Sequence, residues 1–246
     1  MKRVAIHQPN FFPWLGFFLK AAVVAEFVVM DDCQINEQGY TRRVLLDKER
    51  DLWLRAPVYR LSDKPIIAAA RLRLDDGRAR SMTREFDLAL GHLPYVSEAH
   101  KFFQPYMAFA RQSDSLISIH LRILKLFFKE LELSPRLVLS SDSGPHPSGR
   151  DRIESILHSR QPCLYVSGAG GKKYLATPGA SPFAAPYVAI DFMAYLKLAE
   201  MEQYSGESVL TTIAMHGLET IKSQLDHAAR LLQVDLLRYP GVHVLP

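Results

Sequence analysis

The order of apolar and polar segments along the chain is typical of an α/β protein. A short apolar run at residues 4–6 leads into a segment punctuated by Pro9 and Pro13, which indicates a buried strand followed by a loop. The continuous apolar stretch 15–25 predicts a buried helix, and residues 27–30, rich in β-favouring side chains, predict a second strand. The crossover rule for such a β-loop-α-β unit predicts that its two strands run parallel.

The rest of the chain continues this alternation around a helical middle. Strands are predicted at 53–58, 66–74, 136–140, 163–166 and 187–191, the last of these being the final strand. Helices are predicted at 83–90, 101–111, 115–131, 149–159, 207–216 and 218–232, with Asp114 as the N-cap of the third. The expected fold is α/β with a mainly parallel sheet and a Rossmann-like N-terminal unit. The layout of His7-Gln8-Pro9 and Leu15-Gly16-Phe17 in this unit also resembles the nucleotidyltransferase-like fold. We expect a single domain, residues 1–246, with a helical insertion at about 82–132.

Composition narrows the function classes. With 48% hydrophobic and 23% charged residues, the 246-residue chain can bury a substantial core. The net charge of +4 comes from basic residues spread along the chain, which argues against nucleic acid and suits a small anionic substrate. No apolar stretch reaches the roughly 18 residues of a membrane span, and there is no signal-peptide pattern. Two distant cysteines exclude a disulfide framework and favour a reducing compartment, so we expect a cytoplasmic protein whose oligomeric state the sequence leaves open.

Three unusual segments follow predicted strands. They begin at His7, Asp31 and Ser167, and ligands of parallel sheets bind at the carboxyl ends of strands. A histidine beside a carboxylate can be a general base, a metal ligand or a substrate clamp, or it can cap the loop through backbone hydrogen bonds. Asp31 and Asp32 can hold a divalent cation or a ribose hydroxyl, or cap a turn. Because neighbouring strand residues face opposite sides, at most one of the two is expected to enter the crevice.

The segment 167–174 joins small residues to two lysines. Gly168 permits close approach to backbone amides and Lys172 can neutralise an anion, although a tight strand-to-helix turn also explains the glycines. In the segment 36–43, Arg42 and Arg43 can clamp an anion or lie solvated on a strand. The aromatic cluster 11–14 can line a sugar or base pocket or form a hydrophobic plug beneath it.

Other features are assigned to packing. Cys163 lies in an apolar strand, while the acids beside Cys33 are expected to raise its thiol pKa and disfavour a thiolate nucleophile. Trp53 and a helical stripe have core spacing; the stripe comprises Leu116, Ile119, Ile123, Leu126 and Phe127. The motifs of serine hydrolases and of dinucleotide-binding dehydrogenases are absent from the sequence.

Several of these segments together resemble the WbqC-like family of bacterial surface-polysaccharide loci. The resemblance is carried by His7-Gln8-Pro9-Asn10, Pro13-Trp14-Leu15-Gly16, Asp31-Asp32 with Gln34, Arg42 or Arg43, Trp53, Ser140-Ser141, and Tyr165-Val166-Ser167-Gly168 with Lys172 and Tyr174. The carboxyl-terminal part departs from the family, because Thr211 and Thr212 follow Ser208 where the family tends to have an acid.

The resemblance implies a transferase that decorates an amino sugar or sugar nucleotide with an acyl or aminoacyl group. In it His7 deprotonates the attacking amine, Asp31 or Asp32 orients His7 or binds a divalent cation, and the 167–174 loop holds the diphosphate. The implied substrate contacts are Gln8, Asn10, Trp14, Gln34, Arg42, Arg43, Ser167, Gly168, Lys172 and Tyr174. The alternatives are a non-catalytic ligand-binding or scaffold protein, and a metal-dependent hydrolase with a tightly held cation at Asp31 or Asp32.

Overall fold

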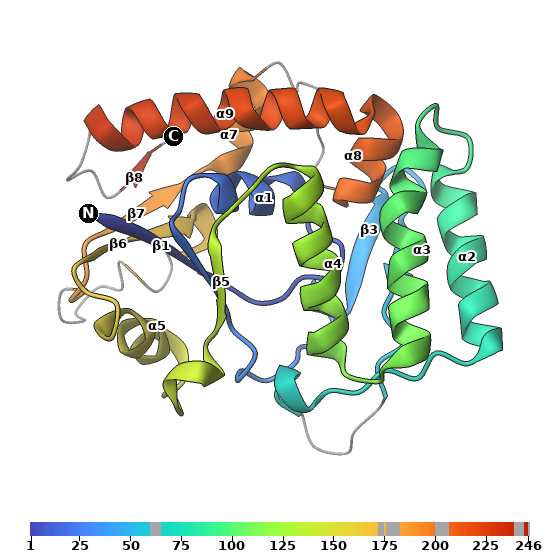
Figure 1. The fold of residues 1–246 in the computed structure, drawn as a ribbon, viewed down its shortest axis with the longest axis horizontal. Helices are drawn as coiled ribbons and strands as arrows, with labels where there is room; N and C mark the ends of the chain where they lie inside the picture. Colours follow the sequence, from blue (N-terminus) through green and yellow to red (C-terminus); the bar gives the residue numbers. More distant parts are fainter. Residues whose placement is uncertain (60–64, 172–174, 176–182, 200–206, 239–243, 246) are drawn as a thin grey trace.

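Six parallel strands form the central sheet of the protein (Figure 1). The computed structural model describes residues 1–59, 65–171, 175, 183–199, 207–238 and 244–245. The strands are β1 (Lys2–His7), β2 (Glu26–Val29), β5 (Arg136–Leu139), β6 (Cys163–Gly168), β7 (Tyr187–Ile190) and β8 (Val244–Leu245), in the order β5-β2-β1-β6-β7-β8. This is the Rossmann order, in which the chain leaves the sheet centre first in one direction and then in the other. The predicted α/β class and parallel sheet are confirmed.

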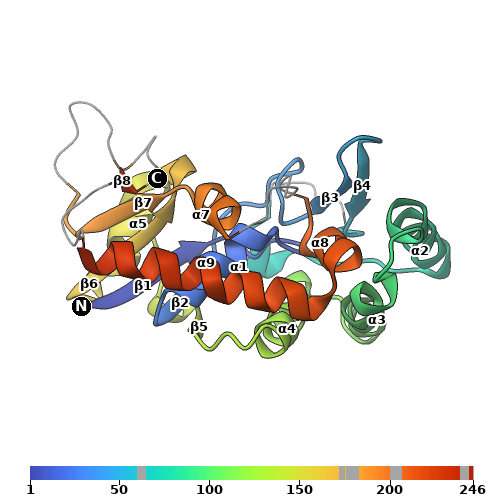
Figure 2. The same ribbon diagram turned by 90° about the horizontal axis from the view of Figure 1, so that it is seen from above.

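Side chains of alternating orientation give the sheet two buried faces. Ala5, Phe27 and Val29 belong to the larger core, on the face covered by α1 (Leu15–Ala22), α7 (Phe192–Leu198) and α9 (Leu218–Arg238). Val4, Ile6 and Val28 face the other way, onto α5 (Gly149–His158). Figure 1 shows α9 above the strands and α5 below them, and Figure 2, seen from above, shows α9 in front. Burial of both faces accounts for the short, almost wholly apolar strands that the sequence displays.

The predicted helical middle forms three helices beside the sheet. They are α2 (Asp76–Leu90), α3 (Val96–Gln112) and α4 (Leu116–Glu130), and α8 (Val209–His216) packs against α3 before the chain enters α9 (Figure 1). The N-cap of α4 is Ser115, which accepts from the Ser118 amide, so the prediction of Asp114 was wrong by one residue. The core stripe of α4 is confirmed, with Leu126 only partly buried.

The segment 66–74 was wrongly predicted as a strand. It contains a 3₁₀ turn, Ile67–Ala69, and isolated bridges. The alternation is real, because Ala70 and Leu72 are buried beside exposed arginines, but the Leu72 amide donates to the Asp114 carbonyl rather than to a ladder. Burial thus alternates without a strand partner.

A small antiparallel ribbon stands apart from the main sheet. Strand β3 (Arg43–Asp47), which the sequence did not reveal, pairs with β4 (Leu52–Arg55). Trp53 was predicted to be core, but it is only half-buried on this ribbon, under the Arg43 guanidinium at 4.2 Å. Helix α7 and strand β8 were also missed, so β7 is not the final strand.

Candidate active site

A cavity of about 760 Å³ lies at the carboxyl ends of β1 and β6, where the order of the strands reverses. This switch point is where open parallel sheets bind their ligands, and the volume is that of a small-molecule site. The loop after β1 and the loop after β6 both line it, so the first and third predicted segments do meet. The second contributes Met30 and Cys33, but neither Asp31 nor Asp32 is among the described lining residues.

His7 ends β1 at the floor of this cavity. Its Nδ1 lies 2.9 Å from the Gln8 carbonyl oxygen, which can only accept, so Nδ1 carries the proton and Nε2 is left as an acceptor. The ring packs edge-on against Phe17 at 5.0 Å between centroids. Burial, reinforced by the charge of Lys20, lowers the pKa of His7 to about 3. The imidazole is therefore neutral at physiological pH.

Lys20 is a functional residue that the sequence analysis missed. It follows Gly16 by four residues on α1, both residues line the cavity, and only 5% of Lys20 is exposed. No carboxylate of the described residues lies within ion-pairing distance of its ammonium, and burial lowers its pKa to about 8. The signal was present: Lys20 is the single charged residue in the apolar run 15–25.

Some side chains of the loop from His7 to Trp14 line the cavity, and others pack beneath it. Asn10 and Trp14 line the cavity, and together with Tyr40 they also line an adjoining recess of about 290 Å³. A Cβ atom at Gly16 would lie 2.0 Å from the Trp14 ring, so the absence of a side chain there admits the indole. Phe11 and Phe12 are each 1% exposed and pack on Tyr106 beneath the loop; Phe11 also borders the recess, whereas Phe12 belongs to the plug alone.

Ser208 supports this loop from the carboxyl-terminal part of the chain. Its hydroxyl donates to the Phe12 carbonyl and also accepts from the Leu210 amide at the start of α8. The Val209 amide donates to the Pro13 carbonyl. The element that departs from the family pattern therefore positions the β1–α1 loop, and Thr211 is used to hold the Leu46 carbonyl.

Asp31 and Asp32 are bound by donors at the ends of β2 and β5. Asp31 accepts from the Ser141 hydroxyl at 2.7 Å, the Ser141 amide at 3.1 Å and the Ser140 hydroxyl at 3.1 Å. Asp32 accepts from Ser140 and pairs with Arg152 at 2.5 Å. Their described partners do not include His7. The pair thus joins β2, β5 and α5 instead of orienting the histidine.

A divalent cation at Asp31 and Asp32 would have to compete with the partners that these carboxylates already have. Three hydrogen bonds reach the Asp31 carboxylate, and Arg152 supplies the countercharge of Asp32. Among the described residues, no three His, Cys, Asp or Glu side chains come together as ligands. Cys33 lies nearby, accepting from Gln8 at 3.3 Å, and burial, with Asp32 contributing, raises its pKa as expected.

The segment 167–171, at the end of β6, forms another part of the cavity wall. Ser167 and Gly168 line the cavity, as do the glycines at 170 and 171. A Cβ at Gly171 would lie 2.1 Å from the Ser167 hydroxyl oxygen, so this turn needs a glycine for packing alone. Lys172 and Tyr174 lie outside the described residues.

The remaining predicted contacts fall in two groups. Gln8 lines the cavity. Gln34 is exposed and forms an isolated β-bridge with Ile66. The two arginines have other partners: Arg42 lies 4.0 Å from Glu37, and the Arg43 guanidinium stacks on the Trp53 ring. None of these three is among the described lining residues. From the same 36–43 segment, Asn36, Gly39 and Tyr40 reach the cavity instead.

The first turn of α5 supplies further lining that the sequence did not indicate. Gly149, Arg150 and Arg152 face the cavity, and α5, like α1, begins without a side-chain cap. Arg150 is bound to Glu154 and Arg152 to Asp32. Asp191, at the end of β7, adds one carboxylate to the wall and accepts from the Met193 amide.

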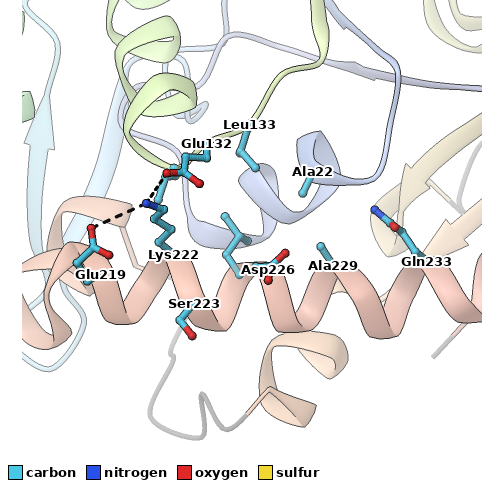
Figure 3. Close-up of a pocket in the computed structure, with 11 residues that line it drawn as sticks. Ala22, Glu132, Leu133, Glu219, Lys222, Ser223, Asp226, Ala229 and Gln233 are labelled. Atoms are coloured by element: carbon cyan, nitrogen blue, oxygen red, sulfur yellow. Dashed lines mark ion pairs between the residues drawn. The ribbon is translucent and has the colours of Figure 1, made fainter.

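A second hollow, of about 350 Å³, lies between α9 and the turn after α4. Figure 3 shows Lys222 of α9 reaching Glu132 and Glu219, with N–O distances of 2.6 and 4.0 Å. These charged side chains of the hollow pair with one another at the surface, and the hollow is remote from the carboxyl ends of the strands. We therefore place the candidate site in the larger cavity.

A parallel sheet in the Rossmann order, with a ligand-sized cavity at its switch point, defines the class of protein: a doubly wound α/β fold. Within that class, the chain belongs to the WbqC-like protein family, whose model matches residues 8–221. An uncharacterized Mycobacterium tuberculosis protein, Rv1507c, is 27% identical over 181 residues, which cover 71% of this chain and 76% of that protein. No solved structure matches significantly. Within the described parts of the chain, no helix has the length and apolar character to cross a membrane.

Proposed function

We propose that the protein is a transferase of bacterial surface-polysaccharide biosynthesis that attaches an acyl or aminoacyl group to an amino sugar carried on a nucleotide. The family to which the chain belongs supports the surface-polysaccharide context, through the resemblance described above. The observation that carries the proposal is the pairing of a neutral His7 with a buried, unneutralised Lys20 in one cavity at the switch point.

His7 has the properties of a group that receives a proton from a bound amine. Its Nδ1 is held by the Gln8 carbonyl, which leaves the Nε2 lone pair free for the substrate. In the reaction, the amine nitrogen attacks the acyl carbonyl carbon and the C–N bond forms. The bond from that carbon to its leaving group breaks, and the leaving group keeps the electron pair. The amine proton passes to Nε2 and then to the leaving group, so His7 is regenerated.

The low pKa of His7 makes it a weak base in the free protein. A general base works best when its pKa lies near the operating pH, and a group with a pKa of about 3 accepts a proton poorly. An anionic substrate bound in the cavity would raise that pKa by offsetting the positive charge of Lys20, which acts in addition to the larger effect of burial. Substrate binding would thereby make His7 a better base.

The adjoining recess supports a reaction between two substrates. Asn10, Trp14 and Tyr40 line both spaces. Groups bound in the two spaces would therefore come close to each other beside these residues. Apart from Asn10 and the Tyr40 hydroxyl, the recess is apolar, which suits an uncharged acyl or sugar portion.

Turnover separates this proposal from a binding or scaffold role. Purified protein is incubated with nucleotide-linked amino sugars and acyl or aminoacyl donors, and the acylated sugar is detected by mass spectrometry. We expect product with the wild type and with His227→Ala, an exposed-histidine control, and a loss of about a hundredfold or more with His7→Ala. Thermal shift by the sugar nucleotide should persist in His7→Ala. Binding without turnover by the wild type, across the donors tested, would instead establish a binding protein.

A further inference from the structure

Lys20 presents a buried positive charge that nothing in its described surroundings neutralises. An ammonium removed from water is costly unless a countercharge accompanies it, and lysine is almost never buried without a partner. The described neighbours of its Nζ are the Phe192 ring, at 5.6 Å, and the backbone of Gly168. Asp191 lines the same cavity, but it is used to cap the Met193 amide and forms no ion pair with Lys20.

We propose that Lys20 and the backbone at Gly168 form a subsite for the phosphate or diphosphate group of the substrate. The subsite rests on the proposed function and specifies where its anionic portion binds. Gly16, in the amino-terminal turn of α1, and Lys20 both line the cavity. Lys20 lies one turn further on the same face of α1, and lysine side chains in helices lean toward the amino end.

The opposite wall leaves room for an anion to approach. A Cβ at Gly168 would lie 3.9 Å from the Lys20 Nζ, so the bare backbone borders the ammonium without contacting it. A Cβ at Gly170 would meet nothing within 4 Å. A phosphate between these surfaces would gain an ionic contact with Lys20 in a site partly shielded from water.

The other cationic side chains among the described lining residues are already paired. Arg150 is bound to Glu154 and Arg152 to Asp32, whereas His7 is uncharged. Among these described residues, Lys20 is therefore the cation available to the ligand, which distinguishes this subsite from a generally basic surface.

The test is isothermal titration calorimetry with inorganic pyrophosphate, which carries the anion without sugar, base or acyl group. Lys20→Met keeps an unbranched chain of similar length, and Lys125→Met removes an exposed lysine of α4 as the matched control. We expect the Kd to rise about tenfold or more in Lys20→Met and to stay unchanged in Lys125→Met. Because the variant removes an uncompensated buried charge, its melting temperature should rise.

A second variant tests the geometry without touching the charge. The methyl group of Gly168→Ala fits the fold, at ordinary contact distance from Lys20 and Phe192, but it stands in the path of the anion. Its affinity for pyrophosphate should fall while its melting temperature stays near that of the wild type. Equal pyrophosphate affinity in the wild type and Lys20→Met would overturn the subsite, as would absence of pyrophosphate binding by the wild type.

The failure of this subsite and the failure of the proposed function can be told apart, because different measurements test them. Pyrophosphate binding requires neither an acceptor nor a donor, whereas the proposed function is judged by product formation. A transferase that binds its sugar nucleotide equally well with Lys20→Met would retain its function and lose this subsite.

Discussion

The guanidinium of Arg152 lies 2.5 Å from the carboxylate of Asp32, and each side chain is 14% exposed. This ion pair connects the segment after β2 to the first turn of α5, whose residues line the cavity. Ser140 adds a hydrogen bond to Asp32 from the end of β5. A single carboxylate therefore fixes three elements to one another, and two of them, the segment after β2 and the first turn of α5, line the cavity.

Replacing Asp32 with asparagine should destabilise the protein by about 3 kcal/mol, because it leaves a largely buried guanidinium without its countercharge. Urea unfolding followed by circular dichroism measures the change. The control is Asp226→Asn, which breaks an exposed pair with Arg230 on α9 and should cost less than about 0.5 kcal/mol. Similar stabilities for the two variants would mean that the Asp32–Arg152 pair does not hold α5 in place.

Glu26 gathers three cations at the opposite, amino-terminal end of the strands. It is 3% exposed, and its carboxylate lies 2.6 Å from Arg160, 2.7 Å from Lys2 and 3.7 Å from Arg136. Burial alone would raise its pKa, but hydrogen bonds from Lys2 and Arg160 outweigh burial, so the pKa falls below the ordinary 4.5. Glu26→Gln should lower the unfolding free energy at pH 7 by about 3 kcal/mol.

The pH dependence of the unfolding free energy tests whether the ionised Glu26 carboxylate stabilises the fold. Its folded pKa is below its unfolded pKa, so the unfolded state binds more protons as the pH falls below 4.5, and the stabilisation is lost there. The stability gap between wild type and Glu26→Gln should therefore narrow from pH 5 downward. Glu219→Gln, at an exposed position of α9, should show no such gap; a gap for Glu26→Gln that is constant with pH would contradict the assignment.

The sequence predicted the sheet well because the pattern of its strands is local. The runs at β1, β2, β5, β6 and β7 are short and apolar, and their parallel arrangement follows from the connections between them. The loops starting at His7 and Ser167, which follow predicted strands, line one cavity. Both features depend on where strands end, which sequence patterns mark clearly.

The errors concern partners, which patterns of single residues do not specify. Asp31 and Asp32 have the composition of a metal or catalytic pair, but their carboxylates are bound by Ser140, Ser141 and Arg152, more than a hundred residues away in the chain. Lys20 was missed because the apolar run 15–25 predicts a buried helix but does not indicate which side chains of that helix face a cavity. The strand expected at 66–74 failed because its buried alternation is matched by loops instead of a neighbouring strand.

Gly16 and Trp14 provide a test of the cavity wall. A Cβ at Gly16 would lie 2.0 Å from the Trp14 ring, so Gly16→Ala must displace the indole from its place over the first turn of α1. In a Trp53→Phe background Trp14 is the only tryptophan, and its emission maximum should shift to longer wavelength as the ring becomes more exposed.

Gly77→Ala is the matched control, because its Cβ would contact only the Asp75 carboxylate at 3.3 Å, in the first turn of α2. It should leave the emission unchanged. Affinity for the sugar nucleotide should fall in Gly16→Ala and not in Gly77→Ala. An unchanged emission spectrum in Gly16→Ala would show that the indole does not depend on this glycine.

Lys20 should give the protein an unusual rise in stability at alkaline pH. Its folded pKa of about 8 lies below the ordinary 10.5, so the unfolded state binds more protons between these values and stability rises as the pH increases through that window. Below pH 8 the full penalty is present. Lys20→Met should then exceed the wild type by about 3 kcal/mol, from 1.36 kcal/mol for each pKa unit.

Urea unfolding at pH 7, 8, 9 and 10 measures this difference, which should shrink as the pH rises. His7, whose pKa the charge of Lys20 lowers, is neutral throughout this pH range in the wild type. The other described titratable groups facing the cavity are common to both proteins; they are Cys33, Tyr40, Arg150, Arg152, Tyr165 and Asp191. Because an anion would restore the charge of Lys20, pyrophosphate should be taken up with a proton near pH 8, and its affinity should decline above that pH. A wild-type protein more stable than Lys20→Met at pH 7 would show instead that the lysine has a stabilising partner.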